Sequence, residues 1–208
     1  MSLTYSQFKD FLKRTMWRDG DTVLDADLDN LIAMADARLN RELRVNDMVT
    51  ITTDNVEGES LTVPTGFLEL QTISATDLST QLVYITPHEM QKTRLDSPTA
   101  MKPFYSLAGT SLLFAGPMSA ADPEPIELIY YSSLPDYSTA DASWVADNYL
   151  DVYVFAALTH AGMYLREDAR IPTWQSLYTD ALTRANEAEI RRKFAGSPLQ
   201  PSLPSGIA

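Results

Sequence analysis

The spacing of apolar residues changes twice along this chain, and this change limits the possible fold more than any other feature. Apolar residues recur at helical spacing up to about Val45, alternate with polar residues from Met48, and return to helical spacing after Leu134. The order of elements is therefore helices, strands and helices again, which predicts an α+β protein. We expect a helical bundle formed by N- and C-terminal helices, with an inserted antiparallel β subdomain.

The same changes set the expected domain boundaries. Residues 1–46 and 136–196 are expected to form the helical bundle, and residues 47–135 the inserted β subdomain. Residues 197–208 are rich in proline and serine and hold only scattered apolar residues, so an extended C-terminal tail is expected there. The sequence shows no internal repeat.

The N-terminal part contains start signals for two helices. Thr4 and Gln7 have the spacing of a capping box, so a helix is expected to begin near Tyr5 and to end at the turn 19–21. A second helix is expected from Asp25 to Val45, with acidic residues in its first turns and arginines toward its end, as the helix dipole favours. The apolar face of the first helix is expected to consist of Tyr5, Phe8, Leu12 and Met16.

Seven runs of β-branched and aromatic residues predict the β subdomain. They are Met48–Thr53, Ser60–Val63, Phe67–Ala75, Gln81–Ile85, Pro103–Ala108, Leu112–Ala115 and Ile126–Ser132. Residues 54–59 predict a hairpin between the first two runs, and residues 76–80 a hairpin between the next two. A second capping signal, Thr86 with Glu89, predicts one or two helical turns.

Two long helical patterns follow the strands. The pattern from Ser143 to Leu158 is apolar on most sides in its second half, so this helix is expected to be the buried centre of the bundle. The last helix is expected from Pro172 to Phe194, with Trp174 and Tyr178 on its apolar stripe. Core packing is the first interpretation of these aromatic residues, and stacking on bases or sugars is the alternative.

Composition excludes several classes of function. The chain of 208 residues has no cysteine, so a disulfide framework, a thiolate metal site and a cysteine nucleophile are excluded. Its formal net charge of −12 argues against a nucleic-acid binder, and an acidic surface that only maintains solubility is the first interpretation of this charge. We expect no signal peptide, because the N-terminus lacks a continuous apolar stretch, and no membrane span, because no apolar window approaches about 18 residues.

Residues for catalysis are scarce. His88 is expected on the surface of a capped helix, and His160 in the core, bonded to a carbonyl or carboxylate. Glu167 and Asp168 imitate a catalytic pair, but adjacent residues point in different directions, so an interhelical corner is expected instead. No recognised catalytic, phosphate-binding or metal-binding motif is present, and we expect no enzyme activity, cofactor or metal.

Several segments together resemble the adaptor, or head-to-tail connector, proteins of tailed bacteriophages. Segment 33–44 is similar to the family's "AEARINRxLR", segment 61–70 to its "LPxDFLEL", and segments 128–135 and 143–158 to its "YYxxxPxL…NWLL…PDLYLYAAL". Two departures concern the start of the last segment, where Ser143 replaces Asn and residues 147–150 lack the usual proline. The residues that carry the resemblance are Arg38, Leu39, Pro64, Phe67, Tyr130, Tyr131, Trp144, Tyr153 and Trp174.

The resemblance implies a structural protein of the virion, located at the head-tail junction and in the host cytoplasm during assembly. It implies a ring of about twelve copies with cyclic symmetry, which joins the portal protein to tail or nozzle proteins and lets DNA pass without specific binding. If the carboxylates of such a dodecameric ring face its channel, they repel DNA and let it slide; charge spread over the outside is the alternative.

The C-terminal tail is the expected element for docking on the portal. A proline-spaced extended segment can become ordered on a partner, and a plain disordered terminus is the alternative. The candidate docking residues are Phe194, Pro198, Leu199, Pro201, Leu203 and Pro204.

Two other functions stay open at this stage. One is a tail-completion or stopper subunit, which differs from an adaptor in binding the tail and not the portal. The other is a small binding module or hydrolase that uses the β subdomain, with Glu167, Asp168 and His160 as its ionisable residues.

Overall fold

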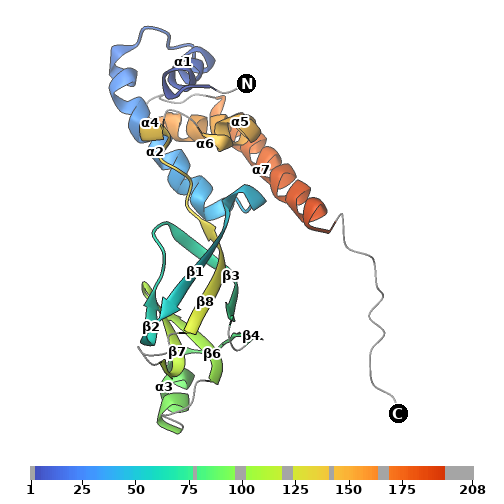
Figure 1. Cartoon of the computed structure of the whole chain (residues 1–208). Helices are drawn as coiled ribbons and strands as arrows, with labels where there is room; N and C mark the ends of the chain where they lie inside the picture. Colours follow the sequence, from blue (N-terminus) through green and yellow to red (C-terminus); the bar gives the residue numbers. More distant parts are fainter. Residues whose placement is uncertain are drawn as a thin grey trace, which may run out of the picture. The chain divides into compact units, whose positions relative to one another are not determined.

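The chain divides into two compact units. The structure, a computed structural model, describes residues 3–76, 79–96, 102–118, 124–140, 143–163 and 169–194. The described residues form α-helices, β-strands and short 3₁₀ helices, which confirms the predicted α+β class. Unit 1 comprises residues 1–46 and 135–208, and unit 2 comprises residues 47–134. Each unit is described separately below (Figure 1).

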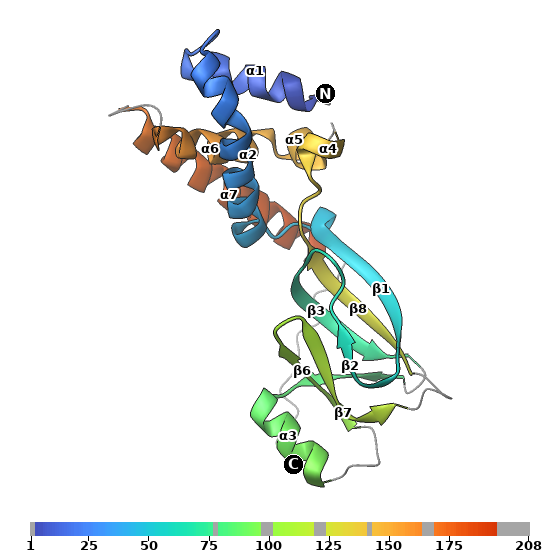
Figure 2. The same cartoon turned by 90° about the vertical axis from the view of Figure 1, so that its left-hand side faces the viewer.

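Helices make up the described part of unit 1. They are α1 (Tyr5–Met16), α2 (Thr22–Glu42), α4 (Tyr137–Ala140), α5 (Trp144–Asn148), α6 (Leu150–His160), the 3₁₀ helix η2 (Ala161–Met163) and α7 (Ile171–Phe194). Helix α6 contacts α1, α2 and α7, so helices from both ends of the chain meet on it (Figure 2).

The start signals of the first two helices are present in the structure. The backbone amide of Gln7 donates to the Thr4 hydroxyl at 3.3 Å, and the Thr4 backbone amide donates to the side-chain Oε1 of Gln7 at 3.0 Å, which confirms the capping box. Helix α2 begins at Thr22, earlier than predicted, because Asp21 accepts hydrogen bonds from the amides of Val23 and Leu24. A residue expected in a turn therefore acts as the N-cap.

Helix α6 is the buried centre of unit 1, as predicted. Six of its residues are buried, and Phe155 is partly exposed. The prediction of one continuous helix from Ser143 to Leu158 is wrong, because Tyr149 leaves the helical conformation (φ −135°, ψ 45°) and separates α5 from α6. The Tyr149 side chain is held in place by its edge-on contact with Trp144 and its hydroxyl group, which donates to Glu189 at 3.2 Å.

Strands and one helix make up the described part of unit 2. After the 3₁₀ helix η1 (Asn46–Met48), they are β1 (Val49–Val56), β2 (Gly58–Thr62), β3 (Phe67–Ala75), β4 (Thr80–Gln81), β5 (Val83–Tyr84), α3 (Pro87–Asp96), β6 (Lys102–Ala108), β7 (Ser111–Met118) and β8 (Glu124–Ser132). They form two four-stranded sheets, in the orders β1-β8-β3-β4 and β2-β7-β6-β5. Their shared core is formed by Val56, Ile73, Ala75, Leu82, Leu112, Phe114, Ile126, Leu128 and Tyr130.

Two predictions about strand pairing are wrong. The expected hairpin between the first two runs does not form: β1 pairs with β8, and β2 pairs with β7 in the other sheet. Gly58, the first residue of β2, has φ +91°, a conformation that glycine adopts readily, and only Glu57 separates it from β1 where the chain changes sheets. The subdomain is also not purely antiparallel, since β5 pairs with β6 in parallel.

The second predicted hairpin and the capped helix after it are both present. Strand β3 pairs with β4 in antiparallel register through Ser74 and Gln81. Helix α3 has the expected reciprocal bonds between Thr86 and Glu89, but it extends over ten residues, longer than the one or two turns predicted. It is stabilised by Arg94, which donates to the Phe114 carbonyl at 2.8 Å and thereby ties the helix to β7.

Candidate assembly surfaces

Arg38 is the residue of the family-like motif with the most polar contacts. Its guanidinium group lies over the ring of Tyr178, 3.9 Å from the centroid, and donates to Glu42 on its own helix at 3.2 Å. It also donates to Thr159 of α6 at 3.0 Å and to Gln175 of α7 at 3.2 Å. Arg38 therefore joins α2, α6 and α7, which is a structural role in unit 1.

The apolar motif residues of unit 1 pack in its interior. Leu39, Tyr153 and Trp174 are all buried, and the Tyr153 ring lies 4.7 Å from the ring of Phe8. Trp144 is partly exposed and contacts Tyr149 edge-on. The spacing of these residues in the sequence thus reflects packing between helices.

The motif residues of unit 2 surround one turn and one strand. Gly66 has φ +78°, and a Cβ atom there would lie 2.7 Å from the Ser133 hydroxyl, so the turn after Pro64 requires glycine. Phe67, just after this turn, places its ring 5.4 Å from that of Tyr130. Tyr130 is buried and Tyr131 partly exposed, because successive side chains of a strand point to opposite faces of the sheet.

The ionisable residues proposed for the alternative hydrolase function do not form a cluster within the part of the chain that the structure describes. His88 is exposed, as predicted. Burial, followed by the positive charges of Arg38 and Arg41, lowers the pKa of His160, and its Nε2 atom has no hydrogen-bond partner among the described residues, contrary to the expected bond. Glu167 and Asp168 lie outside the described residues. Within the described residues, no group of three or more acidic or histidine side chains is arranged to hold a metal ion.

Asp36 of α2 is a partly buried acidic residue of unit 1. Burial raises the pKa of Asp36 to about 6, and the negative charge of Asp136 adds to the shift. The Tyr153 hydroxyl lies near this carboxyl and opposes the shift, but it makes no hydrogen bond of good geometry among the described residues. Asp136 itself stays ionised, because hydrogen bonds from Ser138 and Thr139 lower its pKa. Ionised Asp36 therefore destabilises unit 1 at neutral pH.

Replacing Asp36 by asparagine is expected to stabilise unit 1 above pH 6. The folded-state pKa of about 6 exceeds the unfolded value of 3.8, so the penalty is fully present above pH 6 and is relieved as the pH falls toward 4. We expect the Asp36→Asn variant to gain on the order of 1–3 kcal/mol at pH 7.5 and little at pH 4. Thermal unfolding at both pH values tests this, and Asp27→Asn is the control at another position of α2. An equal gain at both pH values would contradict the proposed cause.

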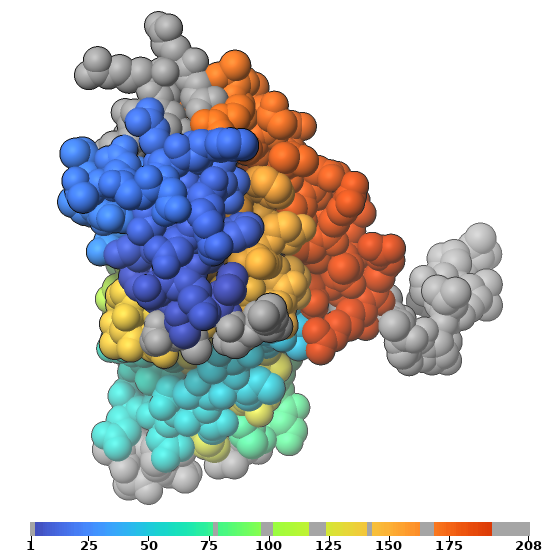
Figure 3. Space-filling model, turned by 90° about the horizontal axis from the view of Figure 1, so that it is seen from above, coloured from blue at the N-terminus to red at the C-terminus, as the bar shows by residue number. Residues whose placement is uncertain are grey.

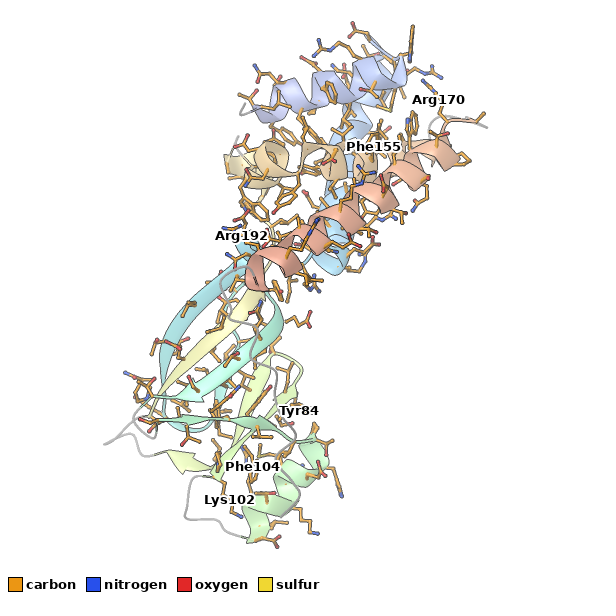
Figure 4. The ribbon with its side chains drawn as sticks, turned by 90° about the vertical axis from the view of Figure 1, so that its right-hand side faces the viewer. Tyr84, Lys102, Phe104, Phe155, Arg170 and Arg192 are labelled. Carbon is orange, nitrogen blue, oxygen red and sulfur yellow. The ribbon has the colours of Figure 1, made fainter. Side chains whose placement is uncertain are left out.

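A groove lies on unit 1 between α1 and α6. It has a volume of about 570 Å³, and its apolar lining comes from Phe11, Leu150, Val154 and Phe155. Thr15, Asn148, Asp147 and Asp151 also line it, and the two aspartates are exposed. Figure 4 labels Phe155 on α6, and Figure 3 shows α6 between the blue α1 and the orange-red α7. We call this feature the α1–α6 groove.

Trp17, at the end of α1, projects from unit 1. It is 86% exposed, and its backbone has φ +61°. Its amide donates to the carbonyls of Arg14 and Lys13, which closes the last turn of the helix. Arg14 and Arg18 on either side are exposed as well. We call Trp17 with these two arginines the Trp17 projection.

Sequence reasoning missed both the groove and the projection. The buried face of α1 is formed by Phe8, Leu12 and Met16, as predicted from their spacing. Phe11 and Trp17 do not belong to that stripe, and two large apolar residues outside the buried stripe of an amphipathic helix are a signal for an interaction surface. Tyr5, also expected on that face, is partly buried: its ring packs edge-on against Tyr137 at 5.3 Å, and its hydroxyl donates to Asp29 at 2.6 Å.

The predicted docking residues are at the end of the chain. Phe194 is the last residue of α7, and its side chain is not described. Pro198, Leu199, Pro201, Leu203 and Pro204 lie outside the described residues. The structure therefore does not test the predicted docking tail.

No helix in the described part of the chain has the length and apolar character needed to cross a membrane.

Comparison with known proteins identifies the family. A search of curated proteins found no significant match. A family model described as "SU10 adaptor protein" matches residues 3–202. This match covers nearly the whole chain, both units included, and it confirms the resemblance to phage adaptors that segments of the sequence indicated. The chain therefore belongs to the SU10 adaptor protein family.

Proposed function

We propose that this protein is the head-to-tail adaptor of a tailed bacteriophage and forms a ring that joins the portal to the tail. The observation that carries the proposal is the family match over residues 3–202. A phage adaptor is a structural, non-enzymatic kind of protein and belongs to the virion. Arg38, Tyr153 and Tyr130 of the family-like motif stabilise the interiors of the two units, so the motif is tied to the fold of both units.

The two units are proposed to have different partners. Unit 1, as a helical bundle built from both ends of the chain, contacts the portal and neighbouring copies. Unit 2, the β subdomain inserted between the two segments of unit 1, contacts neighbouring copies or the next tail component. The division of the chain into residues 1–46 with 135–208 and residues 47–134 supports this assignment, since each unit has its own core.

Binding experiments with separate particles test the function. Purified protein is mixed with portal particles and, separately, with tails of the same phage, and each mixture is centrifuged through a density gradient. An adaptor is expected to sediment with the portal particles. A tail-completion or stopper subunit would sediment with tails alone, and sedimentation with neither would exclude both functions.

DNA is proposed to pass through the ring without specific binding, and the acidic charge supports this. Unit 2 contains eleven acidic and three basic residues, so it carries −8 of the formal net charge of −12. A channel wall with this charge repels the phosphates of the duplex, because binding to DNA depends on lysine and arginine.

Charge reversal in unit 2 is expected to slow genome ejection. Replacing Glu57 and Glu69, which are both exposed, by lysine changes the charge of unit 2 from −8 to −4 per copy. We expect the assembled ring to retain DNA in a salt-dependent manner and ejection from the phage particle to become slower. The same positions replaced by glutamine provide a control of equal size. Unchanged ejection in the lysine variant would contradict an electrostatic role of these residues.

The C-terminal segment is proposed to dock on the portal. Phe194, Leu199 and Leu203, spaced by the prolines at 198, 201 and 204, suit an extended segment that becomes ordered on a partner. Deletion of residues 197–208 is expected to abolish attachment to portal rings without changing the melting temperature of the protein. Cosedimentation and thermal unfolding check the two expectations. Attachment of the shortened protein would refute this docking role.

A further inference from the structure

We propose that the Trp17 projection of one copy enters the α1–α6 groove of a neighbouring copy and forms the contact between subunits in the ring. This inference rests on the proposed function and deepens it, since it names the surfaces that hold adjacent copies together. Both surfaces lie on unit 1, so the contact does not depend on how the two units are arranged.

The conformation and exposure of Trp17 argue for a partner. A residue at φ +61° after the last turn of a helix is usually glycine, because a Cβ atom makes this conformation unfavourable. Here the position holds tryptophan, which has the largest side chain of the standard amino acids, and this residue is 86% exposed to solvent. Both features are unfavourable for the isolated subunit. Tryptophan is enriched among the residues that contribute most to protein interfaces, so an interface accounts for both.

The groove has the chemistry to receive this side chain. Its apolar lining, from Phe11, Leu150 and Phe155, offers a surface for an indole ring, and its volume of about 570 Å³ lies in the range of binding pockets. The projection carries Arg14 and Arg18, and the groove carries Asp147 and Asp151. Two cations beside the entering ring therefore face two carboxylates beside the receiving surface.

Charge also favours a second copy over the C-terminal tail as the occupant. Residues 197–208 contain no lysine or arginine, so the tail has no side-chain cation to offer Asp147 and Asp151. Trp17 does not fill the groove of its own chain, because it is 86% exposed although Phe11 and Thr15 of the same helix line that groove. The projection and the groove are different surfaces. A contact between different surfaces of identical subunits repeats head to tail and can close into a ring.

Disulfide trapping tests the contact, because the natural chain has no cysteine. One full-length variant carries Asp19→Cys beside the projection, and a second carries Asn148→Cys in the groove. The control pair combines Asp19→Cys with Thr183→Cys, an exposed position on α7. After mixing and oxidation, we expect at least about tenfold more cross-linked heterodimer from the pair with Asn148→Cys than from this control pair.

The Trp17→Gly substitution separates assembly from folding. Glycine relieves the φ +61° conformation, so the variant is expected to melt at the same temperature as the natural protein or higher. When Asp19→Cys also carries Trp17→Gly, we expect the cross-link to Asn148→Cys to fall to the level of the control. An undiminished cross-link would overturn the inference. A cross-link from Asn148→Cys to Ser202→Cys in place of Asp19→Cys would assign the groove to the tail and overturn it as well.

The same proteins distinguish this inference from the proposed function. If the natural chain attaches to portal particles and no cross-link between Asp19→Cys and Asn148→Cys forms there, the inference fails and the adaptor function stands. If the cross-link forms in solution but the chain sediments with neither portal particles nor tails, the subunit contact stands and the adaptor function fails.

Discussion

Replacing Phe8 by alanine is expected to lower the free energy of unfolding of unit 1 by about 3–5 kcal/mol. Phe8 is completely buried, and its ring lies 4.7 Å from Tyr153 and 5.6 Å from Tyr137. Truncation leaves a cavity beside the two aromatic side chains from α4 and α6. Because unit 2 has a separate core, its own unfolding transition is expected to stay unchanged.

Scanning calorimetry measures this effect. The fluorescence of the tryptophans follows the unfolding of unit 1 alone, because all of them lie in this unit. The matched control is Phe11→Ala, which removes the same side chain from the same helix where it is 37% exposed. We expect a smaller loss of about 1–2 kcal/mol for this control, because more than a third of Phe11 is already exposed to solvent. Equal losses for the two variants would contradict the observed burial. Phe11→Ala also tests the groove, since it is expected to weaken the Trp17 contact while the subunit stays folded.

The corresponding change in unit 2 is Leu112→Ala, which we expect to lower the stability of unit 2 by about 2–5 kcal/mol. Leu112 of β7 is completely buried in the core shared by the two sheets. Leu95 of α3 is 83% exposed, so Leu95→Ala is the control of equal chemistry and is expected to change stability little. Calorimetry is expected to show a lower unit 2 transition and an unchanged unit 1 transition. A single transition that shifts as a whole in both core variants would show that the units do not unfold independently.

Local signals in the sequence predicted the helices of this fold well. The bonds between Thr4 and Gln7, and between Thr86 and Glu89, depend on residues three positions apart, so their spacing alone specifies them. Strand pairing depends on distant parts of the chain. Val49 of β1 lies opposite Tyr131 of β8, and no turn sequence encodes such a partner. The acidic segment before Ser60 suggested a hairpin, but Gly58 instead leads the chain into the other sheet.

The candidate site was harder to predict than the fold. The family-like motif led to Arg38, Tyr153 and Trp174, which stabilise the interior of unit 1 and do not form a surface. Periodicity identifies the side of a helix that faces the core, so residues outside that side receive no interpretation. Phe11 and Trp17 are such residues, and only the structure shows that one lines a groove and the other projects.

Electron microscopy of the purified chain mixed with portal particles of the same phage tests the central claim most directly. The account predicts a second ring stacked on the portal, with cyclic symmetry and with unit 1 of each copy in contact with unit 1 of the next. Portal particles that remain bare at saturating protein, or that carry isolated subunits without contacts between neighbours, would contradict it.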